Sequence, residues 1–399
     1  MSRALRLLSV LVIAAAGSSC SEQTVLIGAV LPLTGSAEIY GKPIRNGIEL
    51  AFAEVTAGDL AYTLELTTVD SGSDPARAAE QAAALYDQGA IAIIGGVTSA
   101  EALEMVEAAD RAERILISPS ASQPQLTGIS KNFYRVFSSD FLEGTKMGNF
   151  ATSTLDLETA VIVAEQQPYA RGIQAVFKEA FERQGGKVLE VIEYPANTSD
   201  FSGLLDRVVT LRPRAVYLAA YANEVAAMIR ELRRLGFAGT ILTTSSFASP
   251  QAIREAGPSA EGVFLTQAVF EVDSETPESR SFVEAYRDKY GTDPDLYAAH
   301  GYDAMKVLAA ALRATQRATP TEMWKGMRSI RDHQGVTGSL QFDEKGDVQK
   351  YPRVYIIKDG APADYEGEVG EKRRELEEKR RELERRMREL ERQRANPGN

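Results

Sequence analysis

Two apolar runs of the chain end in small hydroxyl residues, and these residues could bind a carboxylate or another small acceptor group. Residues 91–100 read IAIIGGVTSA, and residues 115–128 read ILISPSASQPQLTG. Each pattern predicts a buried strand that ends at a turn, after which a helix begins. The N–H groups and hydroxyls at such turns, with the partial positive charge of a helix amino terminus, suit an acceptor group. The first hypothesis is therefore ligand binding without chemistry.

The sequence lacks the usual motifs of catalysis, cofactor binding and metal binding. Its two histidines, His300 and His333, are not in a zinc-binding spacing, and no GxSxG motif offers a nucleophile. The segment GSAEIYGK, residues 35–42, differs from a phosphate-binding loop because five residues separate its glycines and Pro43 follows its lysine. The sequence therefore predicts a protein that is not an enzyme and that needs no cofactor or metal.

Strand and helix patterns alternate from residue 25 onward, which predicts an α/β fold of parallel sheets covered by helices on both faces. Ligands bind at the carboxyl edge of such sheets, where both hydroxyl-bearing turns would lie. The predicted strands are 25–33, 62–70, 91–96, 115–120, 159–165, 187–194, 215–221, 240–246, 262–270, 339–343 and 353–359. The predicted helices are 44–54, 75–88, 100–113, 172–184, 201–211, 223–235, 279–290 and 297–315.

Length and charge limit the class of protein. A chain of 399 residues is too long for one core of ordinary size, which predicts two domains. Its hydrophobic fraction of 44% and charged fraction of 25% are typical of a folded, soluble protein. A net charge of -11 argues against a nucleic-acid partner, because phosphate binding needs a clustered basic face.

The amino terminus predicts export. Residues 1–20 carry two arginines, an apolar stretch and small residues before Cys20, which is the layout of a signal peptide. Cys20 is the only cysteine, so an internal disulfide is excluded. Its position predicts lipidation of the mature amino terminus, with an unmodified cysteine as the alternative. We therefore expect a periplasmic or cell-surface protein, anchored to a membrane by lipid.

The carboxyl terminus predicts a charged helix. Residues 371–394 are almost entirely Glu, Arg and Lys, with Leu376, Leu383 and Leu390 spaced seven apart. Acidic residues precede basic ones by four positions, which stabilises a helix by about 0.2–0.5 kcal/mol per pair. A solvated helix explains this segment. The alternative is a weak coiled-coil contact with a partner helix.

Residues 25–359 resemble the type I periplasmic binding proteins, in particular the leucine/isoleucine/valine-binding receptors of ABC transporters. The resemblance rests on IGAVLPLTGSAEIYGKPIRNGIELA, the paired IIGGVTSA and ILISPSASQPQLT, AVYLAAYANEVAAMIRELRRLGF, YAAHGYDAMKVLAAAL and LQFDEKGDVQKY. It implies two Rossmann-like lobes joined by a three-stranded hinge. Lobe 1 would comprise 24–140 and 270–347, and lobe 2 would comprise 141–269 and 348–366.

The resemblance implies a receptor that closes on a small ligand and delivers it to an ABC permease in the membrane. The ligand would be amino-acid-like, an amide or a carboxylate. The alternative is a regulatory or scaffolding lipoprotein that uses the same fold for protein contacts, with the charged tail as a docking helix.

The same resemblance implies the residues of the site. Ser99, the backbone of Ala121 and Ser122 would hold the ligand carboxylate, although the two serines could instead cap helices. The aromatic walls would come from four tyrosines, which could alternatively be ordinary packing residues: Tyr40 and Tyr297 against the ligand, and Tyr169 and Tyr221 closing from lobe 2.

One position departs from the pattern of the branched-chain amino-acid receptors. The acid that would pair with a ligand ammonium group falls at Ser245, and serine carries no charge. Glu224 is expected to be solvated on its helix rather than to replace that acid. The sequence therefore leaves the ligand open, and it predicts that Ser245→Glu would improve the binding of α-amino acids.

Overall fold

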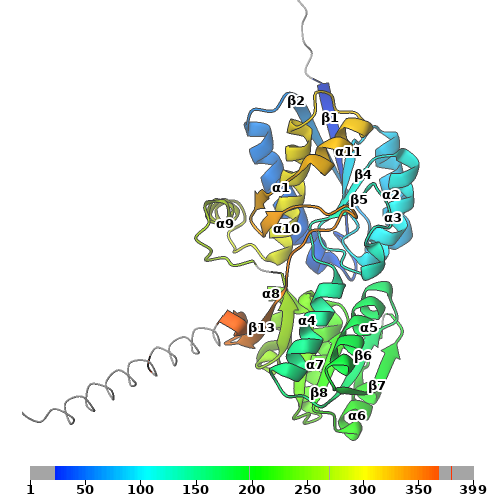
Figure 1. The fold of residues 1–399 in the computed structure, drawn as a ribbon, viewed down its shortest axis with the longest axis vertical. Coiled ribbons are helices and arrows are strands. Elements are labelled where there is room, and N and C mark those ends of the chain that lie inside the picture. The colour runs from blue at the N-terminus through cyan, green and yellow to red at the C-terminus, as the bar shows by residue number, and fades with distance from the viewer. Residues whose placement is uncertain (1–22, 197, 269, 368–378, 380–399) are drawn as a thin grey trace, which may run out of the picture.

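The computed structural model describes residues 23–196, 198–268, 270–367 and Lys379. The predicted signal peptide, Cys20 and the charged tail, except for Lys379, lie outside these residues. The described chain forms two α/β lobes stacked end to end, as Figure 1 shows. Within the described part of the chain, none of the helices combines the length and the hydropathy needed to cross a membrane.

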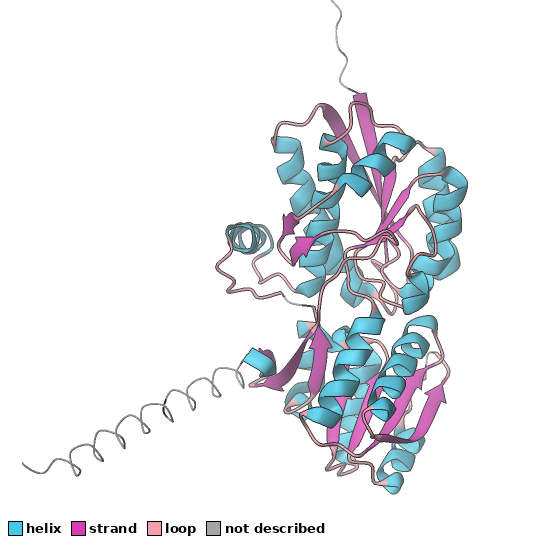
Figure 2. Cartoon of the chain, viewed as in Figure 1, coloured by secondary structure: helices cyan, strands magenta, loops and turns pink. Residues whose placement is uncertain are grey.

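Lobe 1 is built on a parallel sheet in the order β2-β1-β3-β4-β5. Alternate residues of its strands face opposite sides, so Ile93 packs toward α2 and α3 while Ile94 packs toward α1 and α10. Helices α9 and α11 also belong to this lobe (Figure 2). The strands are β1 (Gln23–Leu31), β2 (Tyr62–Asp70), β3 (Ala92–Gly95), β4 (Ile115–Ser118) and β5 (Phe133–Arg135). The helices are α1 (Glu38–Ala57), α2 (Pro75–Asp87), α3 (Ser99–Ala112), α9 (Pro277–Tyr290), α10 (Leu296–Arg313) and α11 (Pro320–Ser329).

Lobe 2 is built on a sheet in the order β14-β13-β10-β9-β8-β6-β7. Its strands from β6 to β10 are parallel, whereas β13 pairs antiparallel with β10 and β14 antiparallel with β13. The strands are β6 (Thr159–Glu165), β7 (Lys187–Tyr194), β8 (Ala215–Ala219), β9 (Thr240–Thr243), β10 (Phe264–Gln267), β13 (Arg353–Lys358) and β14 (Ala361–Asp364). The helices are α4 (Asp140–Ser153), α5 (Pro168–Arg183), α6 (Ser202–Leu211), α7 (Ala222–Arg234) and α8 (Pro250–Ala256).

The chain crosses between the lobes three times (Figure 1). The crossings follow β5, follow β10, and follow the two-stranded sheet of β11 (His333–Gly335) and β12 (Gly338–Leu340). A buried ion pair between Arg135 and Asp347 joins the end of β5 to the third crossing, with Nε to Oδ1 at 2.7 Å. The first and third of the connecting segments are therefore fastened to each other on the side of lobe 1.

The predicted two-lobed α/β fold is confirmed, and β2, β6 and β7 have the predicted ends. The sequence patterns missed α4, α8, α11, β5, β11 and β14, because these elements are short or carry weak apolar periodicity. The sheet of lobe 2 adds an antiparallel edge, formed by β13 and β14, to its parallel strands. Helix α1 begins at Glu38 rather than after Pro43, and this places Tyr40 in its first turn.

Close helix packing in lobe 1 depends on glycine. A Cβ atom on Gly47 of α1 would lie 2.0 Å from the carbonyl oxygen of Ala298 on α10, and one on Gly301 would lie 2.4 Å from the carbonyl oxygen of Ile44. Both distances are far shorter than any van der Waals contact, so only glycine permits this approach. The packing of α1 against α10 brings the amino-terminal turns of these helices, with Tyr40 and Tyr297, to the same side of lobe 1.

Candidate ligand-binding site

The carboxyl edges of the two sheets face each other around a cavity of about 30 Å³. Direct hydrogen bonds join the two lobes beside this small cavity, so the lobes are closed on each other. A ligand of amino-acid size must therefore enter when the lobes separate. Lobe 1 supplies Tyr40, Val97, Thr98, Ser99, Ser120, Ser122, Phe137 and Tyr297, and lobe 2 supplies Tyr169, Tyr221, Ser245 and Ser246.

Tyrosines join the two lobes across this cavity. The Tyr40 hydroxyl accepts a hydrogen bond from the N–H of Ala222 at 2.7 Å and donates one to the carbonyl of Ser246 at 3.2 Å. The Tyr297 hydroxyl donates to the carbonyl of Ser245 at 2.9 Å. Burial raises the pKa of both hydroxyls, so they stay neutral donors. Closure therefore depends on tyrosine hydroxyls that bond directly to the backbone of lobe 2.

The aromatic rings form one connected wall. The centroids of Tyr40 and Tyr297 are 4.7 Å apart, and those of Tyr40 and Tyr221 are 5.9 Å apart. Tyr169 stacks on Tyr221 with centroids 5.3 Å apart, and its hydroxyl donates to Thr244 Oγ1 at 2.6 Å. All four tyrosines predicted from the sequence thus lie at the cavity. They would offer a largely apolar aromatic surface to a ligand side chain.

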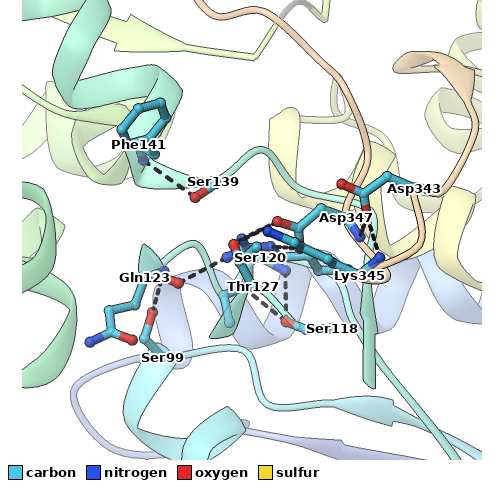
Figure 3. Close-up of polar contacts among 12 residues, drawn as sticks. Ser99, Ser118, Ser120, Gln123, Thr127, Ser139, Phe141, Asp343, Lys345 and Asp347 are labelled. Atoms are coloured by element: carbon cyan, nitrogen blue, oxygen red, sulfur yellow. Dashed lines mark hydrogen bonds and ion pairs between the residues drawn. The ribbon is translucent and has the colours of Figure 1, made fainter. Parts of the chain in front are cut away.

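The amino terminus of α3 faces the cavity through Thr98 and Ser99. Thr98 caps this helix, since its hydroxyl accepts from the N–H of Glu101 at 3.2 Å while Glu101 accepts from the N–H of Thr98. Ser99 is therefore not the capping residue. Its hydroxyl oxygen accepts from the N–H of Gln123 at 3.3 Å (Figure 3). The positive end of the helix dipole would favour a carboxylate at this wall.

In the turn after β4, the backbone of Ala121 does not lie where the sequence analysis placed it, against a ligand carboxylate. Its N–H donates to Ser118 Oγ at 2.9 Å, and Ala121 does not line the cavity. Ser118 in turn donates to the carbonyl of Gly96, so this hydroxyl ties the two turns of lobe 1 together. The structure places Ser120 and Ser122 on the cavity wall instead. A ligand carboxylate in this conformation would meet the serine hydroxyls rather than the Ala121 N–H.

Two buried acids lie behind the cavity wall, and the sequence analysis did not single them out. Glu143 accepts from the N–H of Ser245 at 2.6 Å and from its hydroxyl at 2.8 Å, and the Asp140 carboxyl interacts with the side chain of Ser122. Burial is the main cause that raises the pKa of both carboxyls, and the nearby Glu143 raises that of Asp140 further. The sequence signal that could have located these two acids is Ser139 followed by Asp140 and Glu143, because a serine before acidic residues is typical of the start of a helix.

Glu165 and Glu224 form a second pair of neighbouring carboxyl groups in lobe 2, and the position of Glu224 differs from the expectation that it would be solvated. This residue is half-buried rather than solvated, and its Oε2 lacks a hydrogen-bond partner, as does Oε2 of Glu165. Burial raises the pKa of Glu224, and burial together with Glu224 raises the pKa of Glu165 to about 7. Among the described residues, no three His, Cys, Asp or Glu side chains gather as metal ligands.

The raised pKa of Glu165 predicts a specific pH dependence of stability. Its ordinary pKa is 4.5, and between that value and about 7 the folded state holds a proton that the unfolded state has released. The free energy of unfolding therefore falls as the pH rises through this window. We expect Glu165→Gln to weaken this fall, as measured by urea denaturation from about pH 5 to about pH 8.

The exposed Glu179 provides the control for that experiment, because Glu179→Gln removes a carboxyl that is 73% exposed. Its pH profile should match that of the wild type. An unchanged profile for Glu165→Gln would contradict the assignment of a raised pKa to Glu165.

The fold agrees with comparisons to known proteins. A family model described as periplasmic binding protein matches residues 24–360. A leucine-binding protein from Thermotoga maritima is 31% identical with a TM-score of 0.81, over 85% of this chain and 97% of that one. A branched-chain amino acid transporter substrate-binding protein from Streptococcus pneumoniae, solved in complex with isoleucine, is 25% identical with a TM-score of 0.80. The match covers 85% of this chain and 98% of that one.

A curated relative extends the same pattern. The leucine-, isoleucine-, valine-, threonine-, and alanine-binding protein of Pseudomonas aeruginosa is 25% identical over 351 residues, which are 87% of this chain and 93% of that protein. The family match covers most of the chain, and it coincides with two lobes that close around one cavity. This protein therefore belongs to the periplasmic binding protein family, in the type I group of the leucine/isoleucine/valine-binding proteins.

Proposed function

We propose that this protein is the exported solute receptor of an ABC importer, and that it binds a small ligand carrying a carboxylate or amide. The observation that carries the proposal is the composition of the cavity. One wall has the amino terminus of α3 with Ser99 and, nearby, Ser122, which suit an acceptor group. The other walls are tyrosine rings, which suit an apolar side chain. The relatives named above bind amino acids, which supports the same ligand class.

Closure of the lobes would be the signal to the transporter. A ligand bound between the lobes stabilises the closed state by its difference in affinity for the closed and open states. The permease would then recognise the closed receptor. Export by residues 1–20 and a lipid on Cys20 would keep the receptor near its permease, outside the cytoplasm.

The test of this function is a thermal-shift screen of the purified protein against amino acids, amides, short organic acids and aromatic acids. A true ligand at about 100 times its Kd should raise the free energy of unfolding by about 2.7 kcal/mol. At least one of these classes is expected to stabilise the protein in a concentration-dependent way. Failure of all four classes would contradict the proposal and would favour a scaffolding role.

A further inference from the structure

We infer that closure of the two lobes is coupled to the uptake of protons by Glu165 and Glu224, two carboxyl groups of lobe 2 that lobe 1 covers when the lobes meet. Acid then favours the closed protein, and alkali favours the open one. This coupling goes beyond the proposed function, because it sets the balance between open and closed lobes for any ligand that binds between them. Neither carboxyl lines the cavity, so neither is a ligand contact.

The two carboxyls lie at the carboxyl edge of the lobe 2 sheet. Glu165 ends β6 on the face that α6 and α7 cover, since Val161 and Val163, the alternate residues of the same strand, belong to the core on that face. In the pairing of β6 with β7, the register partner of Glu165 is Tyr194, whose hydroxyl has no hydrogen-bond partner among the described residues. Glu224 lies in the first turn of α7 and is close enough to act on the charge of Glu165.

Lobe 1 packs on this part of lobe 2 through the first turn of α7. The N–H of Ala222 donates to the Tyr40 hydroxyl at 2.7 Å, and the side-chain amide of Asn223 donates to the carbonyl of Ser36 at 3.5 Å. Glu224 is the next residue of this turn. Both carboxyls lie close enough to Tyr40 to add to the effect of burial in raising the pKa of its hydroxyl. Closure therefore takes water away from the carboxyl pair.

The protein supplies no cation to this pair. Among the described residues, neither Glu165 nor Glu224 takes part in an ion pair. Glu165 is 6% exposed, and the side chain that opposes the rise of its pKa is the neutral Gln167. A buried carboxylate without a cation is costly, and two neighbouring carboxylates are costlier still. The pair avoids this cost by taking up a proton.

The ionisable groups that face the pair from the neighbouring elements bring no positive charge. They are Tyr194 of β7, Tyr221 before α7, Tyr40 of α1 and, across Tyr221, Glu101 of α3. Burial raises the pKa of all three tyrosines, so they stay neutral. Glu101 and the two buried acids of α4, Asp140 and Glu143, are present in every variant compared below. A difference between variants therefore isolates the pair.

Closure gains protons over a defined range of pH. In the closed arrangement, burial and the nearby Glu224 raise the pKa of Glu165 from 4.5 to about 7, and burial raises the pKa of Glu224. Opening returns water to the pair and moves each pKa toward its ordinary value. Between these values the closed state holds a proton that the open state has released. Closure therefore becomes less favourable as the pH rises through this range.

Distances between spin labels on the two lobes test this coupling without any ligand. The label sites are Glu107 on α3 of lobe 1 and Glu179 on α5 of lobe 2, whose side chains are 78% and 73% exposed. Figure 1 shows α3 and α5 on opposite lobes. Glu107→Cys and Glu179→Cys are combined with Cys20→Ser, so that only these two positions carry labels. Electron paramagnetic resonance then measures the populations of close and distant label pairs.

The ratio of closed to open protein should rise at least about tenfold from about pH 8 to about pH 5, against a maximum of about 70-fold for one group whose pKa shifts from 4.5 to about 7. Glu165→Gln should remove most of this rise, because an amide stays neutral at every pH. Glu224→Gln should weaken the rise as well, and it replaces Glu165→Gln if that variant fails to fold.

Glu158→Gln is the matched control, because Glu158 is an exposed glutamate at the opposite end of β6, just before Thr159. It should leave the pH response of the wild type unchanged. Label distances that do not change between these pH values would overturn the coupling, as would equal responses in Glu165→Gln and the wild type.

A comparison with unfolding separates closure from folding. If Glu165→Gln changes the pH dependence of unfolding but not that of the label distances, lobe 2 alone buries the pair and the coupling is wrong. The ligand screen decides the receptor function independently of each of these results, because the label measurement contains no ligand.

Discussion

Replacing Ser99 and Ser122 together with alanine is expected to lower ligand affinity by about 10²- to 10⁴-fold while the protein stays folded. A hydrogen bond to a charged group contributes about 1.5–3 kcal/mol, and the double variant removes two hydroxyls from the wall that would hold the ligand carboxylate. Both serines line the cavity. Because Thr98 caps α3, loss of the Ser99 hydroxyl removes no helix cap, and its stability cost is limited to the weak 3.3 Å hydrogen bond from the N–H of Gln123.

The measurement is calorimetric titration with the ligand found in the screen, alongside thermal unfolding of both proteins without ligand. Ser279→Ala serves as the control, because Ser279 is a buried serine whose hydroxyl donates to the carbonyl of Val336 instead of facing the cavity. Binding by the double variant at wild-type strength would contradict the placement of the carboxylate at these serines.

Replacing Asp347 with alanine is expected to lower the free energy of unfolding by about 3–5 kcal/mol, which is a large share of the typical 5–15 kcal/mol. The Arg135 side chain is 0% exposed and forms two bonds with Asp347, from Nε to Oδ1 and from Nη2 to Oδ2, both at 2.7 Å. Removal of the aspartate leaves a buried guanidinium charge without its partner. Figure 3 shows Asp347 beside Thr127, close to the turn that carries Gln123.

Urea denaturation with the Asp347→Ala variant measures this loss. The double variant Arg135→Met with Asp347→Leu should recover most of the stability, because it removes the buried charge together with its partner. Glu179→Ala breaks an exposed pair with Arg183 and should cost only about 0.3–0.5 kcal/mol. If Asp347→Ala costs no more than Glu179→Ala, the ion pair does not fasten the third crossing.

The effect of Asp347→Ala should extend to the ligand site. Arg135 holds the carbonyl of Gln123, and the N–H of Gln123 donates to the Ser99 hydroxyl. One chain of hydrogen bonds thus connects the third crossing to the cavity wall. We expect the variant to bind ligand more weakly even under conditions in which it is fully folded, because the turn that orients Ser99 loses a fixed neighbour.

Much of the fold could be predicted from local patterns in the sequence. The alternation of apolar strands with amphipathic helices predicted two α/β lobes, because the period of burial is set by residues a few positions apart. The ends of β2, β6 and β7 followed from the same patterns. Helix α4 was missed because its sequence, DFLEGTKMGNFATS, has two glycines and a weak apolar stripe. Its stability comes from packing against α5 and β10, which no local pattern records.

The sequence by itself determined the hydroxyl-bearing strand ends and the tyrosines, and their role in binding a ligand stays a prediction. Tertiary structure alone decided that Ser120 rather than Ala121 faces the cavity, and that Glu143 stands behind Ser245 at a separation of 102 positions in the chain. The physical reason is that a hydrogen bond depends on atoms within about 3 Å of each other, whichever residues carry them. The buried carboxyl group beside position 245 was therefore visible only after the chain had folded.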